Sequence, residues 1–206
     1  MGLYSEWIFP KFFDVLVRHK YFDAKRVTAL KEVKGKVLEI GIGTGLNLDC
    51  YPSAVREIYA IDPNPGMKRE LFAKHSDHRV KIHFSQTGAE NLPYDSETFD
   101  TIVSTLTFCS IPDLPAALAE MKRVLKTKGK IIFMEHGLSH ERSVAKWQRR
   151  LDPIQKVVGC GCSLTVNATD ELKRAGFNVT RGETYYVQKA PKFVGYVYEG
   201  IAVKGH

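Results

Sequence analysis

The stretch "LEIGIGTGLNLDCYP", residues 38–52, decides the fold, because it places three glycines at alternate positions directly after an apolar run. Glycine loses more backbone freedom on folding than any other residue, so this cluster requires a reason. Either the turn needs torsion angles that other residues avoid, or a ligand approaches the main chain closely. A strand, a glycine turn and a helix form a site for nucleotide-like ligands at the carboxyl edge of a parallel sheet.

The spacing of the glycines argues against a dinucleotide ligand. The dinucleotide fingerprint is G-x-G-x-x-G, whereas Gly41, Gly43 and Gly45 follow G-x-G-x-G and Leu46 stands where the third glycine belongs. Glu39, two residues before the first glycine, would repel a pyrophosphate but would suit an ammonium group. The pattern therefore favours a cationic, phosphate-free nucleoside and disfavours a nicotinamide oxidoreductase.

A second acidic residue supports the same ligand. Asp62 ends the strand predicted over 56–62 and follows Gly45 by 17 positions. An acid at the end of the second strand accepts hydrogen bonds from two ribose hydroxyls. The glycine turn alone is a weak signal, but Glu39 before it and Asp62 after it make the pattern specific.

Predicted strands and helices alternate along the chain, which indicates a parallel sheet covered on both faces. The apolar patterns predict strands over 36–41, 56–62, 80–86, 99–105 and 129–137, and helices over 64–75 and 114–126. Asp113 is the expected cap of the helix over 114–126.

The end of the chain has a different pattern. A last helix begins at a capping Asn167 or Thr169 and ends at Gly176. Strands near 177–187 and 193–204 form an antiparallel pair, because their connection is short. We therefore expect an α/β fold with a Rossmann-like, doubly wound sheet of seven strands, the last of them antiparallel.

The N-terminal segment, residues 1–33, is expected to be helical. Apolar residues recur at helical spacing over 7–20, and a second short helix is predicted over Asp23–Glu32 with Val27 and Leu30 facing inward. The aromatic side chains of this segment favour a lid over the ligand. The alternatives are an amphipathic anchor on a membrane surface and ordinary core packing.

Length and composition predict one domain over 1–206, with 44% apolar and 26% charged residues. The net charge of +7 is spread along the chain, so we expect a solvated surface. Peripheral membrane contact through the N-terminal helix is the next alternative, and no nucleic-acid partner is expected. No apolar run is long enough to cross a bilayer, and no signal-peptide pattern is present at the N-terminus.

The four cysteines, at 50, 109, 160 and 162, predict reduced thiols in a cytoplasmic protein. Cys160 and Cys162 form C-x-C, and no second Cys/His pair at ligand spacing completes a metal site. We therefore expect no metal, and a structural or substrate-facing role for the thiols.

Four segments resemble the class I S-adenosylmethionine-dependent methyltransferases. "LEIGIGTG" is similar to their first motif and "AIDPNPGM" to their acidic second motif. "TGAENLPYDSETFDTIVSTLTFCSI" is similar to the adenine-binding segment with the fourth strand, and "EMKRVLKTKGKIIFMEHG" to the segment that ends in the fifth. The resemblance covers 37–137, which it implies is the cofactor-binding core, with a substrate-side insert and C-terminal strands over 138–206.

A narrower resemblance is to the methyltransferase-like 7 group, whose animal members methylate small alkyl thiols. It rests on the short motifs "FCSIPD", "FMEHG", "KWQRRLDP", "GC" and "AGF". The group usually carries a basic residue shortly after its Gly-Cys stretch, whereas this chain has Val166 and Asn167 there. This departure puts the substrate side of the resemblance in doubt.

The resemblance implies a set of residues that bind S-adenosylmethionine: Glu39, Gly41, Gly43, Gly45, Asn47, Asp62, Pro63, Asn64, Ala89, Glu90, Thr105 and Leu106. Asp62 would hold the ribose, and Ala89 and Glu90 would meet the adenine. Thr105 and Leu106 would run along the methionine portion. Ordinary loop or packing chemistry is the alternative for each of these residues.

Methyl transfer from a sulfonium is an in-line displacement, so positioning and desolvation are the main tasks of the protein. His136 is the first catalytic candidate, because an imidazole can accept a thiol proton near neutral pH. Asp152 is the second, as a group that orients a base. The acceptor-side candidates are Tyr4, Cys109, Trp147 and Cys160. Structural roles are the alternative for all six.

The predicted function is methyl transfer from S-adenosylmethionine to a small or lipophilic acceptor, and the narrower resemblance favours a thiol. The alternative acceptor is the amine of phosphatidylethanolamine, since small bacterial phospholipid N-methyltransferases share the fold and a related glycine stretch. A remote alternative is a non-catalytic nucleoside-binding module.

Overall fold

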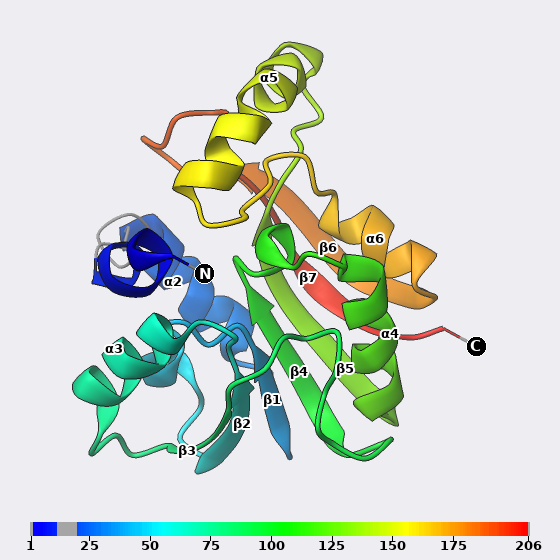
Figure 1. Cartoon of the computed structure of the whole chain (residues 1–206). Helices are drawn as coiled ribbons and strands as arrows, with labels where there is room; N and C mark the ends of the chain where they lie inside the picture. Colours follow the sequence, from blue (N-terminus) through cyan, green and yellow to red (C-terminus); the bar gives the residue numbers. More distant parts are fainter. Residues whose placement is uncertain (1, 12–19, 206) are drawn as a thin grey trace.

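The computed structural model describes residues 2–11 and 20–205, and one sheet of seven strands forms its centre (Figure 1). The strands are β1 (Val37–Ile40), β2 (Glu57–Ile61), β3 (Lys81–Ser85), β4 (Phe99–Thr105), β5 (Leu125–His136), β6 (Phe177–Tyr186) and β7 (Tyr196–Lys204). Their order is β3-β2-β1-β4-β5-β7-β6. Among them β7 runs antiparallel to both of its neighbours, while β1 to β5 pair in parallel. The predicted fold class is confirmed.

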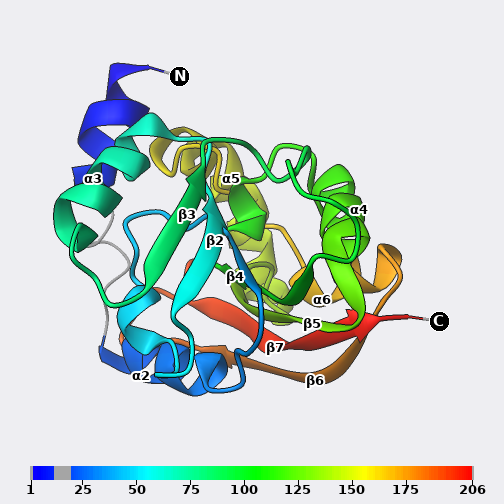
Figure 2. The same ribbon diagram turned by 90° about the horizontal axis from the view of Figure 1, so that it is seen from below.

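Helices cover both faces of the sheet. They are η1 (Tyr4–Ile8), α2 (Lys20–Leu30), η2 (Leu48–Cys50), α3 (Pro65–His75), η3 (Phe108–Ser110), α4 (Leu114–Val124), α5 (Arg142–Val158) and α6 (Ala168–Arg174). Figure 2 shows α4 and α6 on one side and α2 on the other. Neighbouring strand residues serve opposite faces, because side chains alternate along a strand. Leu38 and Ile102 pack with α4, whereas Val37 and Val103 pack with α2.

Side-chain caps begin three of the helices. Asn64 accepts a hydrogen bond from the Gly66 N–H at the start of α3. Asp113 and Asn167 cap α4 and α6 in the same way, as the sequence predicts. Gly176 follows α6 with a φ of 78°, the left-handed conformation expected at the end of a helix.

The second helix differs from its prediction in bounds and in one side chain. It spans Lys20–Leu30, and Val27 is 44% exposed although Leu30 is buried. Phe22, Arg26 and Leu30 lie at intervals of four and form the buried stripe. Val27 lies outside this stripe, and the polar Arg26 takes the inward position that periodicity alone assigned to an apolar residue.

Three other predictions change in detail. In the helix predicted over 7–20, residues 12–19 lie outside the described residues, and the described part is the π-helix η1 followed by helical turns to Lys11. β5 begins at Leu125, directly after α4, instead of at 129. The insert that follows β5 contains α5, a helix that the sequence interpretation missed. Within the described residues, no helix is both long and apolar enough to cross a bilayer.

Candidate cofactor and acceptor site

The backbone conformation of the turn after β1 accounts for its three glycines. Gly41, Gly43 and Gly45 have φ values of 66°, 55° and 89°, which other residues adopt only with strain. A Cβ on Gly41 would also lie 2.4 Å from the Thr107 side chain. Torsion angles and close packing within the chain therefore both require glycine here.

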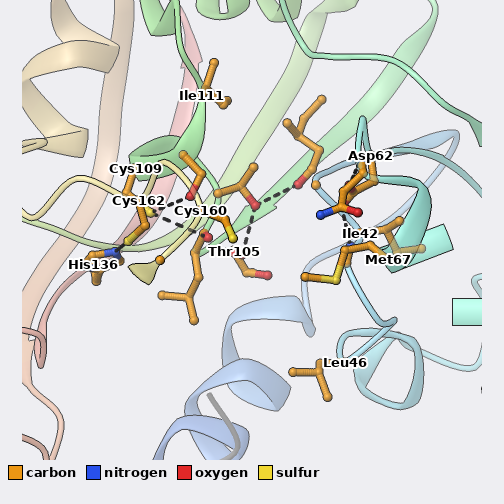
Figure 3. Close-up of a pocket in the computed structure, with 18 of the residues that line it drawn as sticks. Ile42, Leu46, Asp62, Met67, Thr105, Cys109, Ile111, His136, Cys160 and Cys162 are labelled. Carbon is orange, nitrogen blue, oxygen red and sulfur yellow. Dashed lines mark hydrogen bonds between the residues drawn. The ribbon is translucent and has the colours of Figure 1, made fainter. Parts of the chain in front are cut away.

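A cavity of about 910 Å³ opens at the carboxyl ends of β1, β2, β4 and β5 (Figure 3). All of the predicted cofactor-binding residues except Gly45 line it. Gly45 does not line the cavity, and a Cβ on it would lie 2.8 Å from the side chains of Leu48, Leu71 and His75. Parallel strands end at one edge of the sheet, so the topology brings these separate segments together.

Asp62 links the glycine turn to the next helix. Its carboxylate accepts hydrogen bonds from the backbone N–H of Gly43 at 3.0 Å and of Asn64 at 2.9 Å. Burial raises the pKa of Asp62 to about 6, against the effect of these two hydrogen bonds. The side chain therefore fixes the shape of the turn and also presents an acceptor to the cavity.

Glu39 lies in a buried polar network. It accepts hydrogen bonds from Asn47 Nδ2 and from the Tyr51 hydroxyl, both at 2.7 Å, and Arg26 donates to Asn47 Oδ1 at 3.1 Å. Burial raises the pKa of Glu39 to about 7, because these hydrogen bonds offset only part of the desolvation. Asn47 also donates to Thr105 at 3.0 Å, which ties the network to β4.

Arg26 is a cavity-lining residue that the sequence analysis missed. Its side chain is 3% exposed, and within the described part of the chain its Nε has no hydrogen-bond partner. The signal in the sequence is its spacing of four from both Phe22 and Leu30, which puts it on the inward stripe of α2. Met67 and Ile111 were missed as well, because they look like ordinary apolar residues.

The other end of the cavity holds a cluster of sulfur and imidazole groups. His136 Nε2 lies 3.0 Å from Cys162 Sγ. The sulfur atoms of Cys109 and Cys162 and a ring nitrogen of His136 all lie within 4.8 Å of one another. Figure 3 shows these side chains pointing toward one another, with Cys160 nearby. Cys162 was not among the predicted acceptor residues, because C-x-C spacing alone does not place it at the end of β5.

The protonation of this cluster follows from its contacts. A hydrogen bond with Cys109 and burial both raise the pKa of Cys162. Burial lowers the pKa of His136, but the hydrogen bond and the charge interaction with Cys162 outweigh burial, so the pKa of His136 lies above its ordinary value. Cys162, whose own pKa is raised, keeps its proton near neutral pH.

Glu135 positions the loop that carries Cys109. Its carboxylate accepts hydrogen bonds from the Thr107 and Phe108 N–H groups at 2.7 and 3.1 Å and from Ser104 Oγ at 2.6 Å. Burial raises its pKa to about 7 against these bonds. The side chain therefore ties the end of β4 to β5, and η3 begins at this point.

Three of the predicted catalytic and acceptor-side residues lie outside the cavity lining. Asp152 accepts hydrogen bonds from Ser163 Oγ at 2.7 Å and Leu164 N at 2.6 Å, so it anchors α5 to the loop after Cys162. Trp147 is 57% exposed on α5. Tyr4 donates from its hydroxyl to the carbonyl of Val158 at 2.8 Å. Asp152 and Trp147 lie on α5, but α5 contributes Gln155 and Val158 to the cavity lining instead, and Tyr4 lies on η1.

The remaining residues predicted for catalysis and for the acceptor side lie in the cavity lining. His136, Cys109 and Cys160 line the cavity. Ser5 and Phe9 of the N-terminal segment also line it, on the side of α3. Asn64 Nδ2 donates to the Ser5 carbonyl at 2.8 Å, which holds this segment against the helix that follows Asp62.

Comparison with known proteins agrees with this geometry. Residues 38–133 match the model of a methyltransferase domain. The chain is 33% identical over 198 residues to thiol S-methyltransferase TMT1A of Homo sapiens, which covers 86% of this chain and 80% of that protein. It is 33% identical over 158 residues to thiol S-methyltransferase TMT1B of Rattus norvegicus, covering 72% of this chain and 64% of the relative.

Two further matches are more distant. A phosphatidylethanolamine N-methyltransferase of Cereibacter sphaeroides is 30% identical over 128 residues, which cover 61% of this chain and 62% of that protein. The solved structure of a SAM-dependent methyltransferase from Aquifex aeolicus has the same fold, with a TM-score of 0.66 at 20% identity over 94% of this chain and 97% of that one. The chain belongs to the S-adenosylmethionine-dependent methyltransferases, in the family of the thiol S-methyltransferases TMT1A and TMT1B.

Proposed function

We propose that this chain transfers the methyl group of S-adenosylmethionine to the thiol sulfur of a small or lipophilic acceptor. The observation that carries the proposal is one continuous cavity with two chemically different ends. Buried carboxylates and a buried guanidinium line one end, and the cluster of His136 with Cys109 and Cys162 lines the other. The names of the relatives TMT1A and TMT1B support a thiol as acceptor.

The polar end of the cavity fits the cofactor. Glu39 and Arg26 offer a buried negative and a buried positive group, which match the ammonium and the carboxylate of an amino acid. The unpartnered Nε of Arg26, among the described residues, is a donor that a carboxylate would satisfy. Asp62 would accept hydrogen bonds from the ribose hydroxyls, and Ala89 and Glu90 would lie along the adenine.

The work of the protein in the reaction is positioning and exclusion of water. The bound cofactor supplies a methyl group on a cationic sulfur, which already makes the carbon electrophilic. Holding a thiol in line with that bond can contribute on the order of 7–11 kcal/mol. Thr105 and Leu106 would align the methionine portion, and the cluster around His136 would receive the acceptor. A thiol must also lose its proton, and His136 is a cavity-lining group to which that proton can pass.

The N-terminal segment would close the cavity. Ser5 and Phe9 line it, and the Tyr4 hydroxyl bridges this segment to the end of α5. We propose a lid role for residues 2–11, because a cationic cofactor reacts faster where water is excluded. A single domain and a cytoplasmic location remain predictions from the sequence.

A phospholipid amine is the second candidate acceptor. Large apolar side chains are exposed on the two segments that meet at the Tyr4–Val158 hydrogen bond: Leu3, Trp7, Ile8, Ile154, Val157 and Val158. We name these six residues the apolar rim. Exposed apolar patches of this kind mark contacts with lipid or protein. The rim and the similarity to a phosphatidylethanolamine N-methyltransferase favour this alternative.

A competition assay tests the two acceptors. The full chain is incubated with S-adenosylmethionine, a small alkyl thiol and phosphatidylethanolamine in mixed micelles, and the products are identified by mass spectrometry. We expect the methyl thioether of the thiol as the main product. Methylated lipid without a thioether would replace the thiol by the amine. Binding of S-adenosylhomocysteine without either product would retain the cofactor site and reject both acceptors.

A further inference from the structure

We propose that Cys109, His136 and Cys162 are the three protein ligands of a zinc ion whose fourth coordination position opens into the cavity. The three residues come from η3, the end of β5 and the loop after α5. Sequence spacing predicts no metal site, because these segments meet only in the folded chain. The identity of the fourth ligand, an acceptor thiol, rests on the proposed function.

The donor set is one that zinc prefers. Zinc binds thiolate sulfur and imidazole nitrogen in tetrahedral sites, and two cysteines with one histidine leave one position for a substrate. Zn–S bonds of about 2.3 Å place two ligand sulfurs roughly 3.8 Å apart. The ligand atoms here already lie within 4.8 Å of one another, so side-chain adjustments of about 1 Å complete the geometry.

The surroundings of the cluster support an ion. Gln155 Nε2 lies 3.6 Å from Cys162 Sγ and can donate a hydrogen bond to a thiolate, as outer-shell groups do in zinc sites. The backbone N–H of Ser163 donates to the Cys109 carbonyl at 2.8 Å, which holds the two cysteine segments side by side. In the described chain, Nδ1 of His136 is buried without a partner. Nε2 of the same ring faces Cys162 Sγ at 3.0 Å, so Nε2 is the nitrogen that would bind the ion.

Charge and access suit a thiol substrate. All three ligands line the cavity, so the fourth position faces the space that the acceptor would occupy. Two thiolates balance the charge of Zn²⁺, because Cys109 and Cys162 release their protons to solvent when they bind it. The buried carboxylate of Glu135, next to His136 in the sequence, already accepts hydrogen bonds from Ser104, Thr107 and Phe108 and does not compete for the ion.

The ion would activate the acceptor directly. The acceptor thiol takes the fourth position as a thiolate, and its proton goes to solvent. A lone pair of that sulfur forms the new bond to the methyl carbon. The bond from that carbon to the sulfonium sulfur breaks, and its electron pair stays on S-adenosylhomocysteine. The thioether product is neutral and a weaker ligand, so it leaves. In this arrangement His136 is a zinc ligand instead of the proton acceptor considered above, because the thiol proton goes to solvent.

Metal analysis of the full chain tests the site. The protein is purified under reducing conditions, loaded with Zn²⁺, dialysed and analysed by mass spectrometry for metal content. Co²⁺ then replaces Zn²⁺ as a spectroscopic probe. We expect about one ion per chain and a thiolate-to-Co²⁺ charge-transfer band. Cys109→Ser and Cys162→Ser should each weaken binding at least tenfold. Cys50→Ser is the matched control, because Cys50 is half-buried on η2 outside the cavity lining, and it should bind as wild type does.

The outcomes separate this inference from the proposed function. If the wild type binds Zn²⁺ no more tightly than the Cys109→Ser/Cys162→Ser variant does, the zinc site is overturned. A chelator-treated protein that methylates an alkyl thiol at the untreated rate would overturn it too, and would leave the thiol function intact. If the ion binds as expected and no form of the protein methylates a thiol, the metal site stands and the thiol function fails. Calorimetry with S-adenosylhomocysteine verifies that the treated protein is folded.

Discussion

At the scale of single residues, the cofactor end of the cavity is defined by two buried carboxylates. Glu39 is 2% exposed and Asp62 is 7% exposed, and each accepts two hydrogen bonds from groups of its own chain. Burial of a carboxylate opposes its ionisation even when it is hydrogen-bonded. The protein therefore keeps two destabilising charges where a cationic nucleoside would compensate them.

This burial predicts a pH dependence for the cofactor-free protein. The pKa of Glu39 is about 7 in the folded chain, whereas its ordinary value is 4.5. Between these two pH values the folded chain therefore binds more protons than the unfolded chain does. The resulting stability is fully present below about pH 4.5 and is lost as the pH rises through 7. Urea unfolding gives the free energy of unfolding of wild type and of Glu39→Gln. The value for wild type minus the value for Glu39→Gln should fall by on the order of 3 kcal/mol from pH 4.5 to 7.5. Parallel pH profiles for the two proteins would contradict the assignment.

At the scale of elements, the segment from α5 to α6 shapes the acceptor end. Cys160 and Gly161 both have positive φ, of 51° and 99°, and this turn after α5 directs Cys162 into the cavity. Asp152 holds the loop that follows through Ser163 and Leu164. The Asp152 side chain also pairs with Lys156 at 2.9 Å, but the lysine is half exposed and this pair contributes little.

Substitution of Asp152 tests whether it acts on structure or on chemistry. Asp152→Ala removes the acceptor of two hydrogen bonds and should lower the free energy of unfolding by about 1–3 kcal/mol. Asp152→Asn keeps the acceptor oxygen and loses only the ion pair, so it should stay within about 1 kcal/mol of wild type. Urea unfolding measures both, and calorimetry should find unchanged affinity for S-adenosylhomocysteine. An Asp152→Asn protein of native stability without activity would restore the catalytic role that the sequence suggests.

At the scale of the whole molecule, the apolar rim joins two segments far apart in the sequence. Leu3, Trp7 and Ile8 belong to the N-terminal segment, and the other three rim residues belong to α5. Figure 1 shows this end of α5 next to the N-terminal helix, above the carboxyl ends of the strands. The rim thus lies beside the cavity, and the chain carries a net charge of +7. Both properties suit contact with an anionic membrane surface.

Vesicle co-sedimentation tests this contact. We expect the full chain to bind vesicles that contain anionic phospholipid, more weakly as salt is added. Ile154→Ser/Val157→Ser should reduce binding several-fold, because it removes two side chains that are 63% and 75% exposed. Val27→Ser is the matched control, since Val27 is also exposed but lies on α2 outside the rim. Equal binding by all three proteins would reject the rim as a membrane contact.

Local patterns carried most of the fold prediction. The strands over β1 to β4, the helices α3 and α4 and the caps Asp113 and Asn167 follow from periodicity and from short-range hydrogen bonding, which neighbouring residues determine. The grouping of the predicted cofactor residues at one end of the cavity was predictable for the same reason, since many of them directly follow strands that must end at one edge. Gly45 was the exception, because its packing beneath the turn depends on residues from α3.

The sequence by itself determined a parallel sheet with a glycine turn, an acid after the second strand and an antiparallel last strand. Each of these features depends on the pattern of neighbouring residues in one short stretch of the chain. Only the tertiary structure decided that Arg26 faces the cavity, that Asp152 anchors a loop, and that Cys109, His136 and Cys162 meet. The Asp152 contacts span 11 and 12 residues, and the contact between His136 and Cys162 spans 26. Their geometry depends on how α2, α5 and the loop after it pack on the sheet, which no local pattern encodes.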